Sequence, residues 1–442
     1  MGRPERPLDS VDEPIVAFAR DLRALRKSAG NPSYRELART AMFAPSVLSS
    51  AASGRRMPTL PVTLAFAAAC GGDQRAWEGR WRSVTAGTAL GGERVRTVSR
   101  AASGYARPAQ LPIDSMTFVG RTQPLSDAVR VITQSDRSNV PLMISGSIGV
   151  GKTAFALRLA DEAAASFPDG QLYADLGATG TDRTPHTIVY GFLRALGVPA
   201  PLVPDDAMQR LGLYRSLLAQ RRVFVLLEDA QDETQVRPLL GRATQGLVVV
   251  TSRARLLGLD SLHRIDLSAF TRDESMALLG QLIGVNRVEA EFEAADALAD
   301  LCGDLPLAVN IVGRMIASRP GWAIAYAAGL LAGDDKLLDS LAVGDVSVRA
   351  RFDAAYRRLP LTSRRALGHL GSIGSRWTTA IGLAGAMSIP LPAADRTLET
   401  LVDAGLLTKA NLAGRYCLPA MVSVFAATAH REAAMLDLTA AS

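Results

Sequence analysis

The chain has 442 residues, of which 48% are hydrophobic, and its formal net charge at pH 7 is +6. This length allows about three domains of roughly 150 residues each, and no apolar run reaches the roughly 18 residues that a membrane span requires. The N-terminus lacks a signal-peptide core, and the cysteines and histidines are too scattered for a disulfide framework or a metal centre. We therefore expect a multidomain cytoplasmic protein without a membrane partner.

Positive charge is concentrated in the first 107 residues, which carry 17 lysines and arginines against 9 acidic residues. Such an excess predicts contact with a polyanion. Ile15, Phe18 and Leu22 fall on one helical face, and Ser33 with Glu36 forms a capping-box pattern at the start of the next helix. Residues 1–86 are therefore predicted to form an all-α domain in which two short helices are joined by a tight turn.

The run "YRELART…SVLSSAASGRRMP" resembles lambda-repressor-like helix-turn-helix domains. In such domains the second helix enters the major groove of DNA. The resemblance places Ser46, Val47, Ser49 and Ser50 against base edges, and Arg55 and Arg56 against phosphates. This helix has no Arg, Gln or Asn, which are the side chains best suited to reading bases, so we expect modest sequence discrimination. The alternative is a helical module that binds a protein rather than DNA.

Residues 87–113 contain small residues, glycine, proline and arginine without hydrophobic periodicity, and we interpret them as a basic linker. An α/β domain with a parallel sheet is expected over 114–270. Its stretch "GSIGVGKT" matches the phosphate-binding pattern GxxxxGK[ST] between an apolar strand and a helix. In this pattern backbone N–H groups surround phosphate oxygens, the lysine reaches the β- and γ-phosphates, and the hydroxyl binds Mg²⁺. The predicted nucleotide contacts are Gly146, Ser147, Ile148, Gly149, Val150, Gly151, Lys152, Thr153 and Ala154.

A buried-strand run ends in Glu228 and Asp229. We predict that Glu228 shares the Mg²⁺ ion with Thr153 and that Asp229 is the general base. Glutamate in place of the usual aspartate adds a methylene group, and a one-residue move along a strand turns the side chain to the opposite face. Hydrolysis of ATP is therefore expected to be slow. Arg253 ends the strand "VVVTSR" and is positioned by this pattern to sense a γ-phosphate.

The motifs "FVGR", "GSIGVGKT", "VLLED", "VVVTSR" and "GDLPLA", in this order, closely resemble the NB-ARC group of signal-transduction (STAND) ATPases over residues 117 to about 430. The resemblance implies that Val119 and Arg121 flank adenine, that Pro306 packs on it, and that Arg253 reads the γ-phosphate. It also implies a helical bundle over 271–346 and a winged-helix domain over 347–442, whose strands surround Asn411–Gly414.

The resemblance further implies that the nucleotide acts as a switch, with ATP and ADP as cofactors together with Mg²⁺. We expect a transcription regulator of the kind found in actinobacteria, whose N-terminal domain binds DNA. Two alternatives remain open at this point. One is an ATPase whose N-terminal module binds protein, and the other is a defence-type signalling ATPase that forms a homo-oligomer in the ATP state on sensing a ligand.

In this family a histidine of the winged helix contacts the β-phosphate of ADP, and an aspartate follows it. The matching stretch here, "RYCLPAMVSVF", has Pro419 and Ala420 at those two places. Neither side chain donates a hydrogen bond. We therefore predict that ADP is held loosely, unless Arg415 or another side chain supplies the contact.

Overall fold

The computed structural model describes residues 14–54, 57–81, 84, 107–113, 117–134, 140–177, 184–241, 245–332, 337–410 and 414–440. The chain divides into two compact units, Met1–Ser103 and Gly104–Ser442. Each unit has a hydrophobic core of its own. Within the described ranges, no helix combines the length and the apolar character needed to cross a membrane.

The N-terminal unit is helical in its described part, with α1 (Pro14–Ser28), α2 (Tyr34–Ala41), α3 (Pro45–Ala51), α4 (Leu60–Ala69) and a helix over 74–81. The predicted capping box at Ser33 and Glu36 is present. The turn between α2 and α3 contains Met42 in a left-handed conformation, with φ of 55°. A core of aromatic and aliphatic side chains holds the helices together: Phe18, Leu22, Leu37, Leu48, Phe66 and Trp77.

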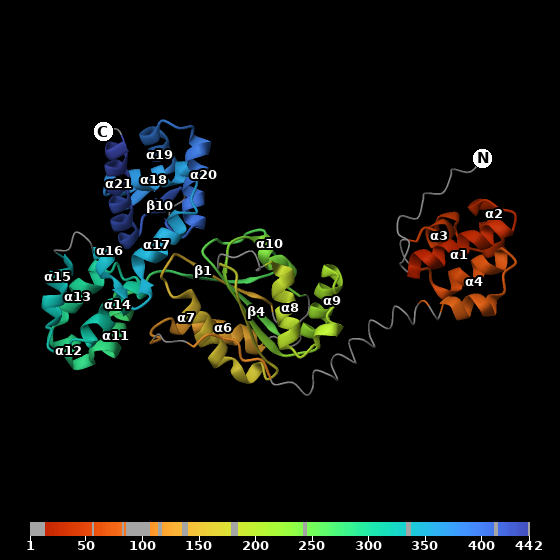
Figure 1. Cartoon of the computed structure of the whole chain (residues 1–442), viewed down its shortest axis with the longest axis horizontal. Helices are drawn as coiled ribbons and strands as arrows, with labels where there is room; N and C mark the ends of the chain where they lie inside the picture. The colour runs from red at the N-terminus through yellow and green to blue at the C-terminus, as the bar shows by residue number, and fades with distance from the viewer. Residues whose placement is uncertain are drawn as a thin grey trace. The chain divides into compact units, whose positions relative to one another are not determined.

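A five-stranded parallel sheet forms the centre of the second unit, in the order β2-β3-β4-β1-β5. Its strands are β1 (Leu142–Gly146), β2 (Gly170–Asp175), β3 (Val223–Ala230), β4 (Leu247–Ser252) and β5 (His263–Leu267). Flanking the sheet are α6 (Thr122–Gln134), α7 (Lys152–Glu162), α8 (Pro185–Ala195) and α9 (Ala207–Leu218) (Figure 1). Apolar runs such as "VFVLL" are buried because helices cover a parallel sheet. The expected α/β architecture is confirmed.

Short elements complete this part of the unit: α10 (Glu233–Val236), η1 (Ala164–Ser166), η2 (Ala200–Leu202) and η3 (Arg237–Leu239). The expected linker over 87–113 proves too long at its C-terminal end. Residues 107–113 run beside β2, where the Gln110 N–H donates to the Gln171 carbonyl at 3.1 Å and the Gln171 N–H donates to the Pro108 carbonyl at 2.7 Å. Residues 87–106 of that linker lie outside the described residues.

The next segment is helical, as expected for residues 271–346. It contains α11 (Arg272–Ile283), α12 (Val285–Ala290), α13 (Phe292–Leu301), α14 (Pro306–Ala317), α15 (Ile324–Ala332) and α16 (Leu337–Ser340). A two-stranded hairpin of β6 (Ala342–Val343) and β7 (Val346–Ser347) follows, which the sequence patterns did not reveal.

The C-terminal segment contains α17 (Val348–Tyr356), α18 (Leu361–Ser372), α19 (Ala380–Met387), α20 (Leu391–Asp403) and α21 (Ala420–Ala440) (Figure 1). A three-stranded antiparallel sheet accompanies these helices, in the order β8-β10-β9. The two strands expected around Asn411–Gly414 are present as β9 (Thr408–Lys409) and β10 (Arg415–Cys417). Strand β8 (Trp377–Thr379) was not expected, and residues 411–413 lie outside the described part of the chain.

Candidate functional site

The glycine-rich loop joins the end of β1 to the start of α7 and requires glycine for steric reasons. Gly149 and Gly151 have φ of 82° and 89°, which side-chain-bearing residues rarely adopt. A Cβ atom on Gly146 would collide with the carbonyl oxygen of Leu267 in β5. The loop therefore combines a sharp turn with a helix N-terminus, where free N–H groups favour an anion.

Lys152, the first residue of α7, folds back over this loop. Its Nζ donates to the carbonyl oxygens of Gly146 and Ser147, both at 2.8 Å. Burial lowers the pKa of Lys152 to about 8, and the positive charge of Arg253 contributes to the same effect, while Asp229 and Glu228 oppose it. Among the described residues, only these two carbonyl groups accept hydrogen bonds from this ammonium group, so a phosphate would be a stronger partner.

Thr153 and Glu228 meet beside the loop, as predicted. The Thr153 hydroxyl donates to Glu228 Oε1. The Tyr173 hydroxyl of β2 donates to Glu228 Oε2 at 2.5 Å, which fixes the carboxylate from the other side. A hydroxyl and a carboxylate held together are hard oxygen ligands of the kind that Mg²⁺ prefers. The residues at this point fit a magnesium ion bound with a nucleotide phosphate.

Asp229 also reaches the same site, which strand alternation did not predict. The register between β3 and β4 shifts between Leu227 and Ala230, and Asp229 has a left-handed φ of 50°. This bulge turns Asp229 toward the end of β4. Its carboxylate accepts two hydrogen bonds from Arg253, at 3.0 Å from Nε and 2.6 Å from a terminal nitrogen. The expectation that Glu228 and Asp229 would point to opposite faces is therefore wrong, because the bulge interrupts the alternation.

These groups line one cleft of about 630 Å³. Its walls come from the phosphate loop, the carboxyl ends of β3 and β4, and helices α14 and α17. The start of α14 is attached to the loop because the Leu307 N–H donates to the Gly149 carbonyl at 3.1 Å. The Ile148 N–H donates to the carbonyl of Gly405, just beyond α20, at 3.3 Å. The loop is therefore contacted by both the helical and the C-terminal segments.

Sequence reasoning missed the α14 and α17 residues of the cleft. Asn310 is only 4% exposed, and its side-chain nitrogen Nδ2 has no hydrogen-bond partner among the described residues. A single polar residue within the apolar helical run "LAVNIVG" was the available signal. The missed cationic residues are Arg314, Arg351 and Arg358, which also line the cleft.

The three residues predicted to contact adenine do not line the cleft. Val119 is partly buried against the hydrophobic core, and Pro306 is buried as the first residue of α14. The Arg121 N–H donates to Glu274 at 2.8 Å, and its guanidinium group lies 5.0 Å from the centre of the Phe270 ring. Burial lowers the pKa of Arg121. The roles of these three residues toward adenine stay predictions.

The residues of the phosphate loop differ in whether they line the cleft. The cleft is lined by Ile148, Gly149, Gly151, Lys152, Thr153 and Ala154. Val150 is buried in the core instead, and Ser147 contributes its carbonyl group to Lys152. The loop lies between a strand and a helix as the pattern predicts, and its residues differ in whether they face the cleft or the core.

In the N-terminal unit, α3 presents a polar face to the surface. The side chains predicted to face bases are all exposed, namely Ser46, Val47, Ser49 and Ser50. Leu48, between them, is fully buried and attaches the helix to the core. The preceding helix α2 carries two exposed arginines, Arg35 and Arg39. Arg55 and Arg56 lie outside the described residues.

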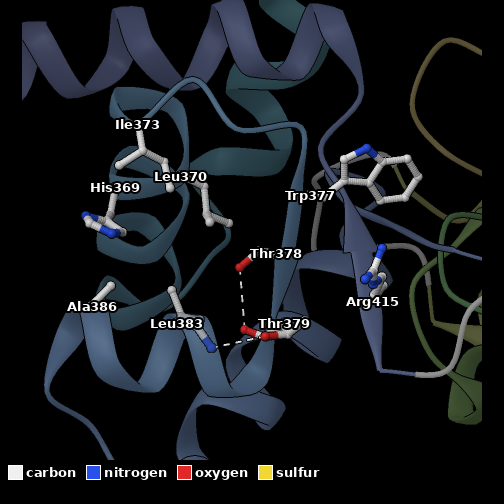
Figure 2. Close-up of a pocket in the computed structure, with 10 residues that line it drawn as sticks. His369, Leu370, Ile373, Trp377, Thr378, Thr379, Leu383, Ala386 and Arg415 are labelled. Atoms are coloured by element: carbon white, nitrogen blue, oxygen red, sulfur yellow. Dashed lines mark hydrogen bonds between the residues drawn. The ribbon is translucent and has the colours of Figure 1, made fainter.

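Arg415 lies elsewhere than in the cleft. Figure 2 shows it beside Trp377 at a groove of about 450 Å³ between the end of α18, strand β8 and the start of α19. Pro419 and Ala420 do not line the cleft either. Ala420 packs near Gly303, since a Cβ atom on that glycine would lie 2.9 Å from the Ala420 Cβ. Arg415, which the sequence offered as a substitute for the missing histidine, therefore does not reach the phosphate loop.

No family model matches the chain. The regulatory protein AfsR of Streptomyces coelicolor is 38% identical over 332 residues, which cover 74% of this chain and 33% of that protein. AfsR of Streptomyces griseus is 36% identical over 329 residues, covering 74% and 34% respectively. The chain thus spans about a third of the length of the curated relatives it matches.

Several solved structures are also similar. The Walker-type ATPase of Pyrococcus abyssi has a TM-score of 0.49 at 13% identity, covering 74% of this chain and 99% of that one. A signal transduction ATPase with a tetratricopeptide repeat sensor, from Pyrococcus horikoshii, has a TM-score of 0.35 at 17% identity, covering 72% and 43%.

Proposed function

Because the chain is homologous to the AfsR regulatory proteins, and so belongs with the NB-ARC-type regulators, we propose that it is a transcriptional regulator switched by ATP and ADP. The observation that supports this most directly is the convergence of Lys152, Thr153, Glu228 and Arg253 on one cleft. A cation, a hydroxyl, a carboxylate and a second cation around a glycine-rich loop form the set of groups that polyphosphate binding requires.

On nucleotide binding, Lys152 exchanges its two carbonyl partners for phosphate oxygens. Thr153 and Glu228 hold the Mg²⁺ ion, which neutralises phosphate charge when it is bound. Asn310 offers its unpartnered Nδ2 donor to the ligand. By the family resemblance, adenine lies near Val119, Arg121 and Pro306. Asp229 acts as the base for slow hydrolysis, and Arg253 responds to the γ-phosphate.

The proposed domains follow the predicted boundaries, with the start of the nucleotide domain moved back to about residue 107. The helical segment 271–346 and the winged helix 347–442 close over ADP, while ATP favours an open state. The output is the N-terminal helix-turn-helix, which reads DNA with the exposed face of α3. All of these steps take place in the cytoplasm.

The test is nucleotide binding by the full chain and by Lys152→Ala. The variant should lose at least about tenfold in ATP affinity, since a charge-assisted hydrogen bond stabilises a complex by roughly 1.5–3 kcal/mol. Arg158→Ala is the matched control, because Arg158 lies on the same helix and forms only an exposed ion pair with Glu162. Equal ATP binding by Lys152→Ala and the wild type would disprove the nucleotide proposal.

A further inference from the structure

Helix α17 turns one face toward the phosphate-loop cleft. Arg351 and Ala354 are three residues apart, which places them on one side of α17, and both line the cleft. Arg358, two residues beyond the end of the helix, lines the cleft as well. Neither arginine belongs to any motif that the sequence analysis identified. The C-terminal segment thus brings two guanidinium groups to a site that is otherwise built from the sheet domain and α14.

The two arginines differ in their partners. Arg358 donates to the Gln231 side chain and to the Gly177 carbonyl, each at 3.0 Å, and so fastens the end of α17 to loops of the sheet domain. Arg351 is exposed and forms no hydrogen bond or ion pair with any other described residue. Arg349, on another face of the helix, is paired with Asp339 at 3.0 Å. Arg351 is therefore available to a ligand in a way that its neighbours are not.

The charges in the cleft leave an excess of positive groups. Its cationic side chains are Lys152, Arg253, Arg314, Arg351 and Arg358, and its acidic ones are Asp175, Glu228 and Asp229. Asp229 is committed to Arg253, and Glu228 accepts from Thr153 and Tyr173. Arg351 is close enough to Lys152 for its charge to lower the lysine pKa. Two like charges facing one cavity favour an anion between them.

We propose that Arg351 binds the terminal phosphates of the nucleotide from the side opposite Lys152, so that the ligand itself joins α17 to the phosphate loop. This inference rests on the proposed nucleotide function. It assigns to Arg351 the cationic contact that the Pro419–Ala420 stretch does not provide and that Arg415, at its separate groove (Figure 2), does not reach. The C-terminal segment therefore senses phosphate through a helix face rather than through the start of α21.

The experiment measures equilibrium binding of ATP and ADP, with Mg²⁺, to the full chain and to Arg351→Ala. We expect affinity for ATP to fall about tenfold or more, as for the loss of one charge-assisted hydrogen bond, and Arg351→Lys to recover part of the loss. Arg357→Ala is the matched control, because Arg357 is an exposed arginine on the same segment that does not line the cleft. Its affinity should stay within about twofold of wild type, since distant surface charges are screened by salt.

Thermal unfolding without nucleotide checks that the Arg351→Ala variant folds as the wild type does, which its exposed position predicts. If Lys152→Ala loses ATP binding while Arg351→Ala keeps it, the inference about Arg351 is wrong and the nucleotide proposal stands. If Arg357→Ala and Arg351→Ala lose equal affinity, the effect is one of general charge and the inference is also wrong. If the wild-type chain binds neither nucleotide, the proposed function itself fails.

Discussion

Asp229 is held in an unusual backbone conformation by two interactions. Its left-handed backbone is supported by a hydrogen bond of 3.0 Å from its own N–H to the Thr251 hydroxyl. Its carboxylate forms a two-point ion pair with Arg253, and these side chains are 26% and 17% exposed respectively. A strained backbone that persists at the edge of a cleft is typical of functional positions. The same carboxylate thus restrains Arg253 and faces the space where we propose that the γ-phosphate lies.

Replacing Asp229 by asparagine removes the charge while keeping the shape. We expect ATP binding to change by only a few fold, because Lys152 and the loop are untouched. Turnover of ATP should fall by about a hundredfold or more, which is the usual effect of losing a general base. Phosphate release measured under single-turnover conditions gives the rate. Asp161→Asn, at an exposed position on α7, is the control, and unchanged turnover in Asp229→Asn would show that water is activated elsewhere.

The predicted residues that lie at the cleft are those whose position follows from local backbone geometry. The turn from β1 into α7 is specified by its own glycines, so Lys152 and Thr153 could be placed without knowing the rest of the fold. Asn310 and Arg351 lie about 160 and about 200 residues after Lys152 in the sequence. Packing between distant segments brings them to the cleft, and no local sequence pattern predicts such contacts. Asp229 was assigned the right region and the wrong face, because a bulge depends on the pairing of two strands.

Among the elements, α11 begins with an arginine that forms ion pairs with three aspartates. The Arg272 guanidinium donates to Asp296 at 2.8 Å and to Asp304 at 3.0 Å, and pairs with Asp300 at 3.2 Å. The hydrogen bonds that Arg272 donates to these aspartates, with that to Asp304 the largest effect, raise the pKa of Arg272 above its ordinary value. One side chain therefore joins α11 to α13 and to the turn that leads into α14, and that turn positions Leu307 against the phosphate loop.

Removal of this guanidinium in Arg272→Ala leaves three carboxylates facing one another. We expect a loss of about 2 kcal/mol in the free energy of unfolding at pH 7, a modest figure because Arg272 is one-third exposed and solvent weakens its ion pairs. The loss should shrink toward pH 4, since carboxyl groups ordinarily become protonated there and both the attraction and the repulsion fade. Chemical unfolding at both pH values measures it, with Arg357→Ala as control. A loss that is equal at the two pH values would mean that Arg272 acts by packing alone.

For the whole molecule, the two units have different charges and different proposed ligands. The first 107 residues carry a net charge of +8, whereas the rest of the chain carries −2. The exposed face of α3 contains serines and a valine rather than base-reading arginines. Binding to DNA through such a surface would depend mainly on phosphate contacts. It would therefore vary strongly with salt and only modestly with sequence, whereas docking to a protein through the same face would not show that dependence on salt.

The double variant Arg55→Ala with Arg56→Ala tests this distinction in the full chain. We expect weaker DNA binding for every sequence, and a slope of log affinity against log salt that is smaller by about one to two, at roughly 0.9 for each lost phosphate contact. The matched control is Arg365→Ala with Arg396→Ala, which removes the same charge from exposed positions in the C-terminal segment and should leave the slope unchanged. Equal slopes in the wild type and the first double variant would show that Arg55 and Arg56 do not contact DNA phosphates. If the wild-type chain shows no salt-dependent DNA binding and assembles on adding ATP, the chain is instead a signalling ATPase whose N-terminal module binds protein.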